Sequence, residues 1–381
     1  MATRTAPRNT DDVLAAEPPE SLDAVVTPAA VVDLPRMRAN IQRMGAYARE
    51  HALALRPHIK THKTPELAAL QLEHGAAGIT VATPREALVM AEVCDDILLA
   101  YPPVGAARLA QLDALPSHVR LGVALDSLDA LAELARRADR AGRTIHVRVE
   151  VDLGMRRVGV CRPEHAIDLA RAAADSRGTA FDGINFYPGH IREPFGAMDD
   201  ALERLNTRLA EFLDALEHAG LRPSVVSGGS TPTAFLSHRV RLQTEIRPGT
   251  YIFNDRVTLA LDACRLEDCA YTVLATVVST AVPGQAVVDA GSKALNREEV
   301  GPDRHDGYGV LLDRPDVRVA RMSEEHGVLD LAGSDWRPRV GDRVRIVPNH
   351  VCVSVNLHDR LWTVEHGRIV GAWRVTARNW G

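Results

Sequence analysis

The chain has 381 residues, of which 46% are apolar and 25% charged; this is typical of a globular protein and excludes a disordered or collagen-like chain. Its formal net charge is −5, from 45 basic and 50 acidic residues, so no basic excess favours nucleic acid as a partner. Five scattered cysteines are too few for a disulfide framework, and no apolar run predicts a membrane span. Because the first 26 residues also lack the apolar segment of a secretory signal, we expect a cytoplasmic protein.

From residue 29 onward, short apolar runs alternate with longer amphipathic segments, a pattern that predicts β-α units. We expect strands at residues 53–59, 79–82, 97–101, 119–125, 145–151, 183–187, 224–227 and 244–246. We expect helices at residues 36–51, 65–74, 85–92, 128–141, 164–177 and 198–219. Eight such units fit a (β/α)8 TIM barrel, whereas a Rossmann sheet would need a GxGxxG turn that the sequence lacks.

After residue 255 the pattern changes, because β-rich runs predominate and few helical segments follow. These runs lie at residues 273–282, 285–289, 317–320, 343–348, 361–364 and 369–373. We therefore predict a barrel over residues 34–255 and a smaller all-β domain over residues 256–381. A further strand at residues 29–33, within the N-terminal segment 1–33, is expected to join the second domain.

In a barrel of this kind the active site forms at the carboxyl ends of the strands, so the residues after each strand are candidates. The first predicted strand runs into the sequence RPHIKTHKTPE, which places Lys60 at its end. The chain has only three lysines, Lys60, Lys63 and Lys293. A lysine amine can form a Schiff base with a carbonyl group, whereas a surface lysine at a strand end is the alternative reading.

The run RPHIKTHKTPE resembles the pyridoxal-phosphate lysine segment of the D-serine dehydratase and D-threonine aldolase family. The barrel of this family is similar to that of the alanine racemases, the fold type III enzymes. Further motifs, given below, follow in the same order along nearly the whole chain from residue 26. The resemblance implies pyridoxal 5'-phosphate as cofactor, Lys60 as the lysine that binds it covalently, and a barrel followed by a β domain.

Two further strand ends match the family. The run DLGMRRVG after residue 151 is similar to an element in which an arginine lies beside the cofactor ring, which implies that role for Arg157. An ion pair of Arg157 with Glu150 or Asp152 is the alternative. The run FYPGH implies that Tyr187 lines the face of the ring and that His190 lies near the substrate, although a lone histidine is as often structural.

A Gly-rich turn, SGGSTP, follows the strand at residues 224–227 and precedes a predicted helix near Thr233. Glycines allow close backbone approach, and hydroxyl groups and a helix N-terminus favour an anion, so the turn is a candidate phosphate site. The run RPGTY after the last strand is similar to the segment that closes the phosphate site of the racemase barrel. The implied phosphate-binding residues are Gly228, Gly229, Ser230, Thr231, Gly249, Thr250 and Tyr251.

The run PNHVC in the β domain places His350 and Cys352 two residues apart. If this segment is extended, both side chains point the same way and present an imidazole and a thiolate to one point. That pair suits zinc, and two protein ligands would leave positions for water or substrate. A buried cysteine beside an unrelated histidine is the alternative, but in the resembling family the matching pair binds the catalytic metal.

Other polar residues receive no role from the sequence. Lys293 and His326 lie in segments that match the family and could approach the site or be structural, and His358 is not assigned. Lys63 is expected to point away from the site. The remaining cysteines, Cys94, Cys161, Cys264 and Cys269, are expected at buried apolar positions, and the four-residue spacer between the last two is not that of a redox motif.

Together these features indicate a lyase that uses pyridoxal phosphate and a divalent metal, zinc or else manganese, on D-β-hydroxy amino acids. β-Elimination of the D-serine dehydratase type would give an oxo acid and ammonia, with Lys60 abstracting the α-proton and the metal polarising the β-hydroxyl. The D preference and a homodimer follow from the resemblance alone. Which hydroxy amino acid is the substrate does not follow from the sequence.

Three alternatives stay open at this point. Retro-aldol cleavage of the D-threonine aldolase type is the nearest alternative to β-elimination, although aldolases of the family often carry aspartate where this chain has Cys352. A racemase would need a second base, usually a tyrosine, on the opposite face of the ring. A non-catalytic pyridoxal-phosphate carrier would resemble the barrel alone, which the second domain argues against.

Overall fold

The structure, a computed structural model, describes residue 19, residues 21–301 and residues 306–379. The strands of its parallel sheet are β2 (Ala54–Leu55), β3 (Ile79–Val81), β4 (Asp96–Leu99), β5 (Arg120–Leu125), β6 (Ile145–Glu150), β7 (Thr179–Asn185), β8 (Val225–Gly228) and β9 (Glu245–Ile246). Their order in the sheet is β2-β9-β8-β7-β6-β5-β4-β3. Parallel bridges from Leu55 to Ala76 and from His58 to Thr80 join the two edges, so the predicted eight-stranded barrel is confirmed.

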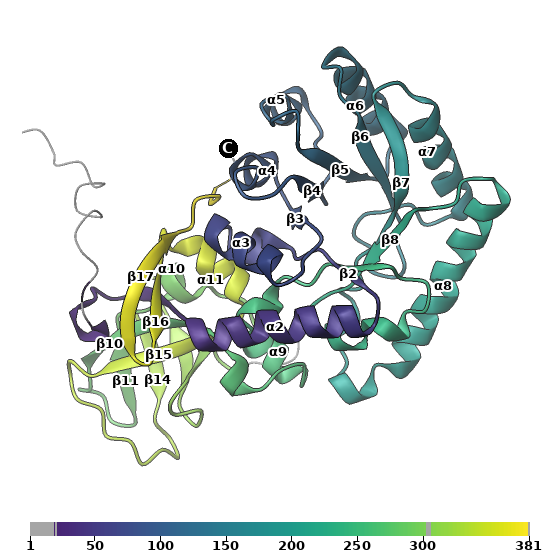
Figure 1. Cartoon of the computed structure of the whole chain (residues 1–381). Helices are drawn as coiled ribbons and strands as arrows, with labels where there is room; N and C mark the ends of the chain where they lie inside the picture. The colour runs from purple at the N-terminus through teal and green to yellow at the C-terminus, as the bar shows by residue number, and fades with distance from the viewer. Residues whose placement is uncertain (1–18, 20, 302–305, 380–381) are drawn as a thin grey trace, which may run out of the picture.

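Helices follow most of these strands (Figure 1). They are α3 (Pro65–Glu73), α4 (Pro84–Met90), α5 (Ala106–Asp113), α6 (Leu128–Arg140), α7 (Pro163–Asp175) and α8 (Asp199–His218), with a 3₁₀ helix, η4 (Ala234–Arg239), after β8. A further helix, α2 (Leu34–Glu50), precedes β2. Side chains of Asp33, Thr83 and Ser127 cap α2, α4 and α6. The unpredicted α5 has Gly105 at its N-cap, which gives no side-chain signal. Within the described residues, no helix is long and apolar enough to cross a membrane.

The second sheet is largely antiparallel, and Figure 1 shows it beside the barrel, with α2 extending along both. Its strands are β1 (Ala29–Asp33), β10 (Tyr271–Ser279), β11 (Gln285–Val288), β12 (Gly309–Leu311), β13 (Arg318–Met322), β14 (Gly327–Asp330), β15 (Arg343–Pro348), β16 (Arg360–Glu365) and β17 (Arg368–Arg374). The N-terminal strand β1 lies between β10 and β16, as the sequence predicts. Three short helices, α9 (Arg256–Ala260), α10 (Ser292–Leu295) and α11 (Val351–Leu357), were not predicted.

A ring of six charged side chains lies inside the barrel. Arginines and carboxylates alternate around it, with N–O distances from 2.5 to 3.5 Å, in the order Arg56, Asp96, Arg120, Asp182, Arg148, Glu245 and back to Arg56. Some of its ion pairs join neighbouring strands, but Arg120–Asp182 joins β5 with β7 and Arg148–Glu245 joins β6 with β9, which are not neighbours in the sheet, so these pairs cross the interior of the barrel. The ring therefore connects opposite sides of the barrel. None of its six residues lines the cavity at the carboxyl ends of the strands.

Glu245 is the most buried carboxylate of this ring. It is 3% exposed and contacts both Arg56 and Arg148. Burial alone would raise its pKa, but the two guanidinium charges outweigh burial and lower the pKa to about 2. Because removing one partner of a buried pair leaves the other charges uncompensated, the ring is expected to be sensitive to loss of Glu245.

We predict that Glu245→Gln lowers the free energy of unfolding by about 3–5 kcal/mol at pH 7, measured by urea denaturation. The pKa of Glu245 is depressed on folding, so its contribution is present above the ordinary value of 4.5 and is lost as the pH falls toward about 2. The difference between the two proteins should therefore shrink over that range. Glu203→Gln is the control, since it breaks an exposed pair with Arg241; equal destabilisation by both variants would contradict the prediction.

Candidate active site

A cavity of about 580 Å³ opens at the carboxyl ends of the parallel strands. Segments after all eight barrel strands contribute to its wall, and the segment that follows β15 closes one side. The predicted site residues that line it are Lys60, Arg157, Tyr187, Ser230, Thr231, Gly249, Thr250, His350 and Cys352. The cavity therefore brings together most of the residues that the sequence singled out, from both parts of the chain.

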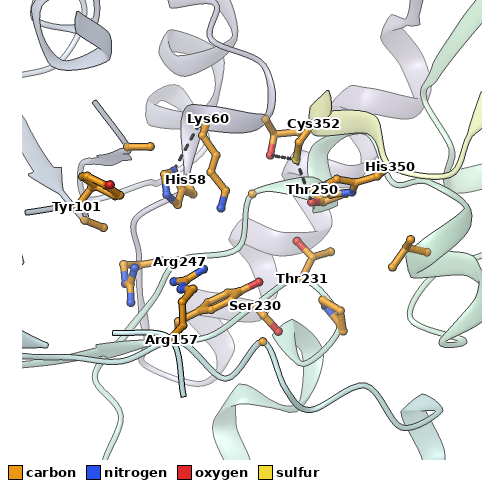
Figure 2. A pocket seen from close by; sticks show the side chains of 18 of the residues that line it. His58, Lys60, Tyr101, Arg157, Ser230, Thr231, Arg247, Thr250, His350 and Cys352 are labelled. Atoms are coloured by element: carbon orange, nitrogen blue, oxygen red, sulfur yellow. Dashed lines mark hydrogen bonds between the residues drawn. The ribbon is translucent and has the colours of Figure 1, made fainter. Parts of the chain in front are cut away.

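Lys60 lies in a single 3₁₀ turn, η2 (Ile59–Thr61), that follows β2. Its backbone N–H donates to His58 Nδ1 (3.4 Å), and its side chain extends into the cavity with Nζ 5.9 Å from the centre of the Tyr187 ring (Figure 2). The other two lysines point elsewhere. Lys63 pairs with the buried Glu86 (3.1 Å), as expected, and Lys293 is exposed and pairs with two surface glutamates. Lys60 is thus the lysine that can reach a molecule in the cavity.

Arg157 lies over the same aromatic ring, with its guanidinium carbon 4.8 Å from the Tyr187 centroid. The alternative ion pairs are otherwise engaged in the structure. Glu150 accepts a hydrogen bond from Asn185, and Asp152 accepts bonds from backbone N–H groups of its own loop. The geometry therefore directs Arg157 toward the cavity.

The candidate phosphate site has a wall of hydroxyl groups. Ser230, Thr231 and Thr250 line the cavity, and Gly249 approaches the Lys60 turn closely, since an added Cβ would lie 2.8 Å from the His58 carbonyl oxygen. A side chain at position 249 would therefore collide with backbone, which explains glycine there.

Three other residues predicted for the phosphate site lie behind this wall. Gly228 packs under the Phe186 ring, and an added Cβ would lie 2.1 Å from it. Gly229 adopts a φ of +94°, which glycine accommodates without strain. The side chain of Tyr251 is buried and bonds Gln71, while its backbone N–H donates to Thr231 Oγ1 (3.1 Å). These residues shape and support the wall.

The structure does not bring His190 to the cavity. It is exposed, and its ring packs against Gly154, where an added Cβ would lie 2.8 Å from Nε2. His326 is exposed as well. His358 points toward the carbonyl oxygen of Ala294, 3.1 Å away. None of these three histidines is among the cavity-lining residues.

His350 and Cys352 converge by a different route from the one expected. The segment is not extended, because β15 ends at Pro348 and α11 begins at Val351 with His350 as its N-cap. The extended conformation considered from the sequence does not form, because Val351 and Val355 pack in the core as part of a helix. Cys352 Sγ lies 3.2 Å from Thr61 Oγ1 and 3.7 Å from Thr250 Oγ1, so the thiol also contacts the barrel (Figure 2).

The two side chains form a coupled acid-base pair. Burial would raise the pKa of Cys352, but the charge of His350, followed by a hydrogen bond to it and the charge of Lys60, lowers the pKa to about 7. Burial would lower the pKa of His350, but the Cys352 thiolate and Asp255 together raise this pKa well above its ordinary value. At neutral pH the metal-free pair is thus rich in thiolate. An imidazole and a thiolate are a donor set that suits zinc.

The cavity also contains polar residues to which the sequence gave no role, among them His58, Glu150 and Arg247. Burial lowers the pKa of His58 well below its ordinary value, so its ring is neutral, whereas burial raises the pKa of the Glu150 carboxyl. The Arg247 guanidinium donates from Nε to Ser227 Oγ and from Nη2 to the Phe186 carbonyl oxygen. Each lies at or just beyond a strand end, so a systematic reading of strand ends would have found them.

The cysteines outside the site follow the expectation only in part. Cys94 and Cys269 are buried and Cys264 is partly buried, but Cys161 is exposed. It lies in the loop between β6 and α7, where its thiol has weak contacts with Asp152 and Gly159. The apolar character of cysteine does not determine burial in a loop.

Comparison with known proteins identifies the class. Residues 32–257 match the family model "Alanine racemase, N-terminal domain", and residues 270–364 match "Putative serine dehydratase domain". The barrel is therefore of the alanine racemase type. The chain belongs to the D-serine dehydratase and D-threonine aldolase family, as its motifs suggest.

Individual relatives span almost the whole chain. D-Threonine aldolase from Arthrobacter sp is 33% identical, covering 95% of each chain. D-threo-3-Hydroxyaspartate dehydratase from Delftia sp. (strain HT23) is 36% identical, covering 88% of this chain and 93% of the relative. The solved structure of a cysteine-to-alanine mutant of D-threo-3-hydroxyaspartate dehydratase in the metal-free form has a TM-score of 0.86 at 32% identity, covering 95% of this chain and all of that one.

The cavity fits the cofactor of this family, pyridoxal phosphate. It offers one lysine amine, a wall of three hydroxyl groups next to a glycine that cannot carry a side chain, and a guanidinium directed inward. At the other side, the donor chemistry of His350 and Cys352 fits a divalent metal. Among the described residues, no group of three or more His, Cys, Asp or Glu side chains is arranged to hold a metal ion. A metal at His350 and Cys352 would therefore have water or substrate as its remaining ligands.

We predict that Cys352 of the metal-free enzyme reacts with iodoacetamide along a titration curve with its midpoint near pH 7, because only the thiolate attacks. Peptide mass mapping at a series of pH values measures this. His350→Ala should move the midpoint upward, since it removes the positive charge that stabilises the thiolate. Zinc should protect Cys352 but leave the exposed Cys161 reactive; protection of neither or of both would contradict the assignment.

Proposed function

We propose that this chain is a pyridoxal-phosphate- and divalent-metal-dependent lyase that acts on D-β-hydroxy amino acids. The observation that carries the proposal is that the Lys60 amine and the His350 and Cys352 pair line one cavity. The favoured reaction is β-elimination, which gives an oxo acid and ammonia. In this proposal residues 34–255 form the barrel that binds the cofactor. Residues 256–381, with a strand from residues 1–33, form the β domain that carries the metal ligands. We propose further that the enzyme is a cytoplasmic homodimer.

Pyridoxal phosphate supplies a carbonyl group for the substrate amine and a ring that withdraws electrons from the α carbon. Lys60 Nζ holds the cofactor and then removes the α-proton, for which its position at the centre of the cavity is suitable (Figure 2). Ser230, Thr231 and Thr250 donate hydrogen bonds to phosphate oxygens. Arg157 fixes the position of the ring from the side of Tyr187.

A divalent metal supplies a Lewis acid for the β-hydroxyl oxygen. His350 and Cys352 would hold it at the edge of the cavity, with Thr61 beside the sulfur. A related dehydratase has been solved as a cysteine-to-alanine mutant in the metal-free form, which suggests that metal dependence occurs among the relatives. Because the donors are nitrogen and sulfur, we propose zinc as the metal and manganese as the second candidate.

Retro-aldol cleavage to glycine and an aldehyde is the second candidate, because the aldolase from Arthrobacter is nearly as similar as the dehydratase. It would use the same residues but would remove the proton of the β-hydroxyl group. Cys352 favours elimination, since a thiolate ligand leaves the metal less acidic than the carboxylate that aldolases of the family often carry.

We predict that Lys60→Ala lowers the rate by roughly 10²- to 10⁴-fold or more, because it removes the base and the covalent attachment of the cofactor. Borohydride reduction of the wild-type holoenzyme and peptide mapping should place the pyridoxyl group on Lys60. Lys293→Ala is the control and should retain activity, since that side chain is exposed. A label on Lys63 or Lys293 would contradict the assignment.

We predict that the unmodified enzyme converts D-threonine mainly to 2-oxobutanoate and ammonia, as measured by coupled assays of both products and of glycine. Cys352→Asp should weaken zinc binding and lower oxo-acid formation by roughly tenfold or more, with a rise in manganese-dependent acetaldehyde release. Glycine as the main product of the unmodified enzyme would replace the dehydratase assignment with the aldolase one.

A further inference from the structure

Asp255 is a fully buried carboxylate next to the proposed metal pair. It lies at the end of the barrel segment as the N-cap of α9, where Oδ1 accepts hydrogen bonds from the backbone N–H (2.9 Å) and hydroxyl (3.0 Å) of Thr258. Its second oxygen faces away from α9. Oδ2 accepts a bond from the backbone N–H of Val351 (3.1 Å) and lies 3.0 Å from His350 Nδ1.

The backbone around His350 is also held by contacts that do not involve Asp255. Val257 N–H donates to the carbonyl oxygen of Asn349 (3.1 Å), and Arg256 Nη1 donates to Asn349 Oδ1 (2.7 Å). Asn349 Nδ2 donates in turn to the carbonyl oxygens of Glu298 and Gly307. The segment therefore has several contacts that do not depend on Asp255, and Asp255 adds to them the hydrogen bond from Val351 N–H and the contact with the imidazole ring.

A carboxylate at one nitrogen of a histidine determines what the other nitrogen can do. When Nδ1–H donates to Asp255 Oδ2, the lone pair is left on Nε2, on the side of the ring away from Asp255. Cys352 follows two residues after His350 and lines the same cavity, so the ring lies between the carboxylate and the side of the cavity that holds the thiol. A ring fixed in this way presents its free nitrogen to a metal without a cost of reorientation.

We propose that Asp255 is a positioning residue of the metal site: through Oδ2 it fixes the orientation and the tautomer of His350 so that Nε2 binds the metal together with Cys352. The inference rests on the proposed metal site. The competing explanation is that Asp255 only caps α9, a role that its other oxygen fulfils with Thr258.

Two variants and one control separate these explanations. Asp255→Asn keeps the size of the side chain and removes its charge, while Asp255→Ser retains a good N-cap for α9 but is too short to reach His350. Thr258→Val is the matched control, since it disturbs the cap and leaves Oδ2 in place. Zinc affinity of each holoenzyme is measured by competition with a chromogenic chelator, alongside the cofactor absorbance.

Both Asp255 variants should bind zinc about 10–100-fold more weakly than wild type with the cofactor absorbance unchanged, and Thr258→Val should retain wild-type affinity. Wild-type affinity in the folded Asp255 variants, or an equal loss in Thr258→Val, would overturn the inference. If wild type itself binds no zinc, or His350→Ala binds it normally, the proposed metal site fails instead. A crystal structure of the zinc-loaded enzyme decides independently of folding: zinc on Nε2 supports the inference, and zinc on Nδ1 overturns it.

Discussion

The barrel depends most directly on the alternating ring of charged side chains in its interior. The ring consists of Arg56, Asp96, Arg120, Asp182, Arg148 and Glu245. A barrel must fill its interior, and here charged side chains from strands on opposite sides do so in place of one apolar layer. Because each charge has two opposite neighbours, the cost of burial is offset only while the ring is complete. The ring also reaches the site, since Glu245 accepts a hydrogen bond from Ser227, which accepts one from Arg247 in the cavity wall.

The cavity depends on a second connection, between the end of the barrel and the start of α11, where the two proposed metal ligands lie. Asp255 contacts His350 and Val351, and Thr61 and Thr250 of the barrel contact Cys352. Barrel residues thus contact both members of the proposed metal pair. The amine of Lys60 and the sulfur of Cys352 are held in one cavity by these contacts, and this arrangement is what a reaction at the α and β carbons of one substrate requires.

The sequence predicts much of the barrel and part of the site, and the reasons differ by residue. Lys60, Tyr187 and Ser230 could be placed because carboxyl ends of parallel strands meet at one face. Strand β1 was also predicted, since its apolar run precedes the barrel units.

The helix that begins at Val351 was not predicted. A β-branched run is compatible with a strand or with a helix packed in the core, and the sequence does not distinguish the two. Arg148 and Glu245 are charged, so from the sequence they resemble solvent-facing positions of their strands, although both are buried inside the closed barrel. His190 follows a strand end, but its loop directs the side chain outward.

In the mechanism that we propose, the cofactor and the metal act separately on one substrate, one held by Lys60 and the other by His350 and Cys352. Removal of the metal with a chelator, with D-threonine as substrate, tests this separation most directly. We expect that formation of both oxo acid and aldehyde stops, that the visible absorbance of the bound cofactor is unchanged, and that zinc restores activity. Full lyase activity in the metal-free enzyme would contradict it.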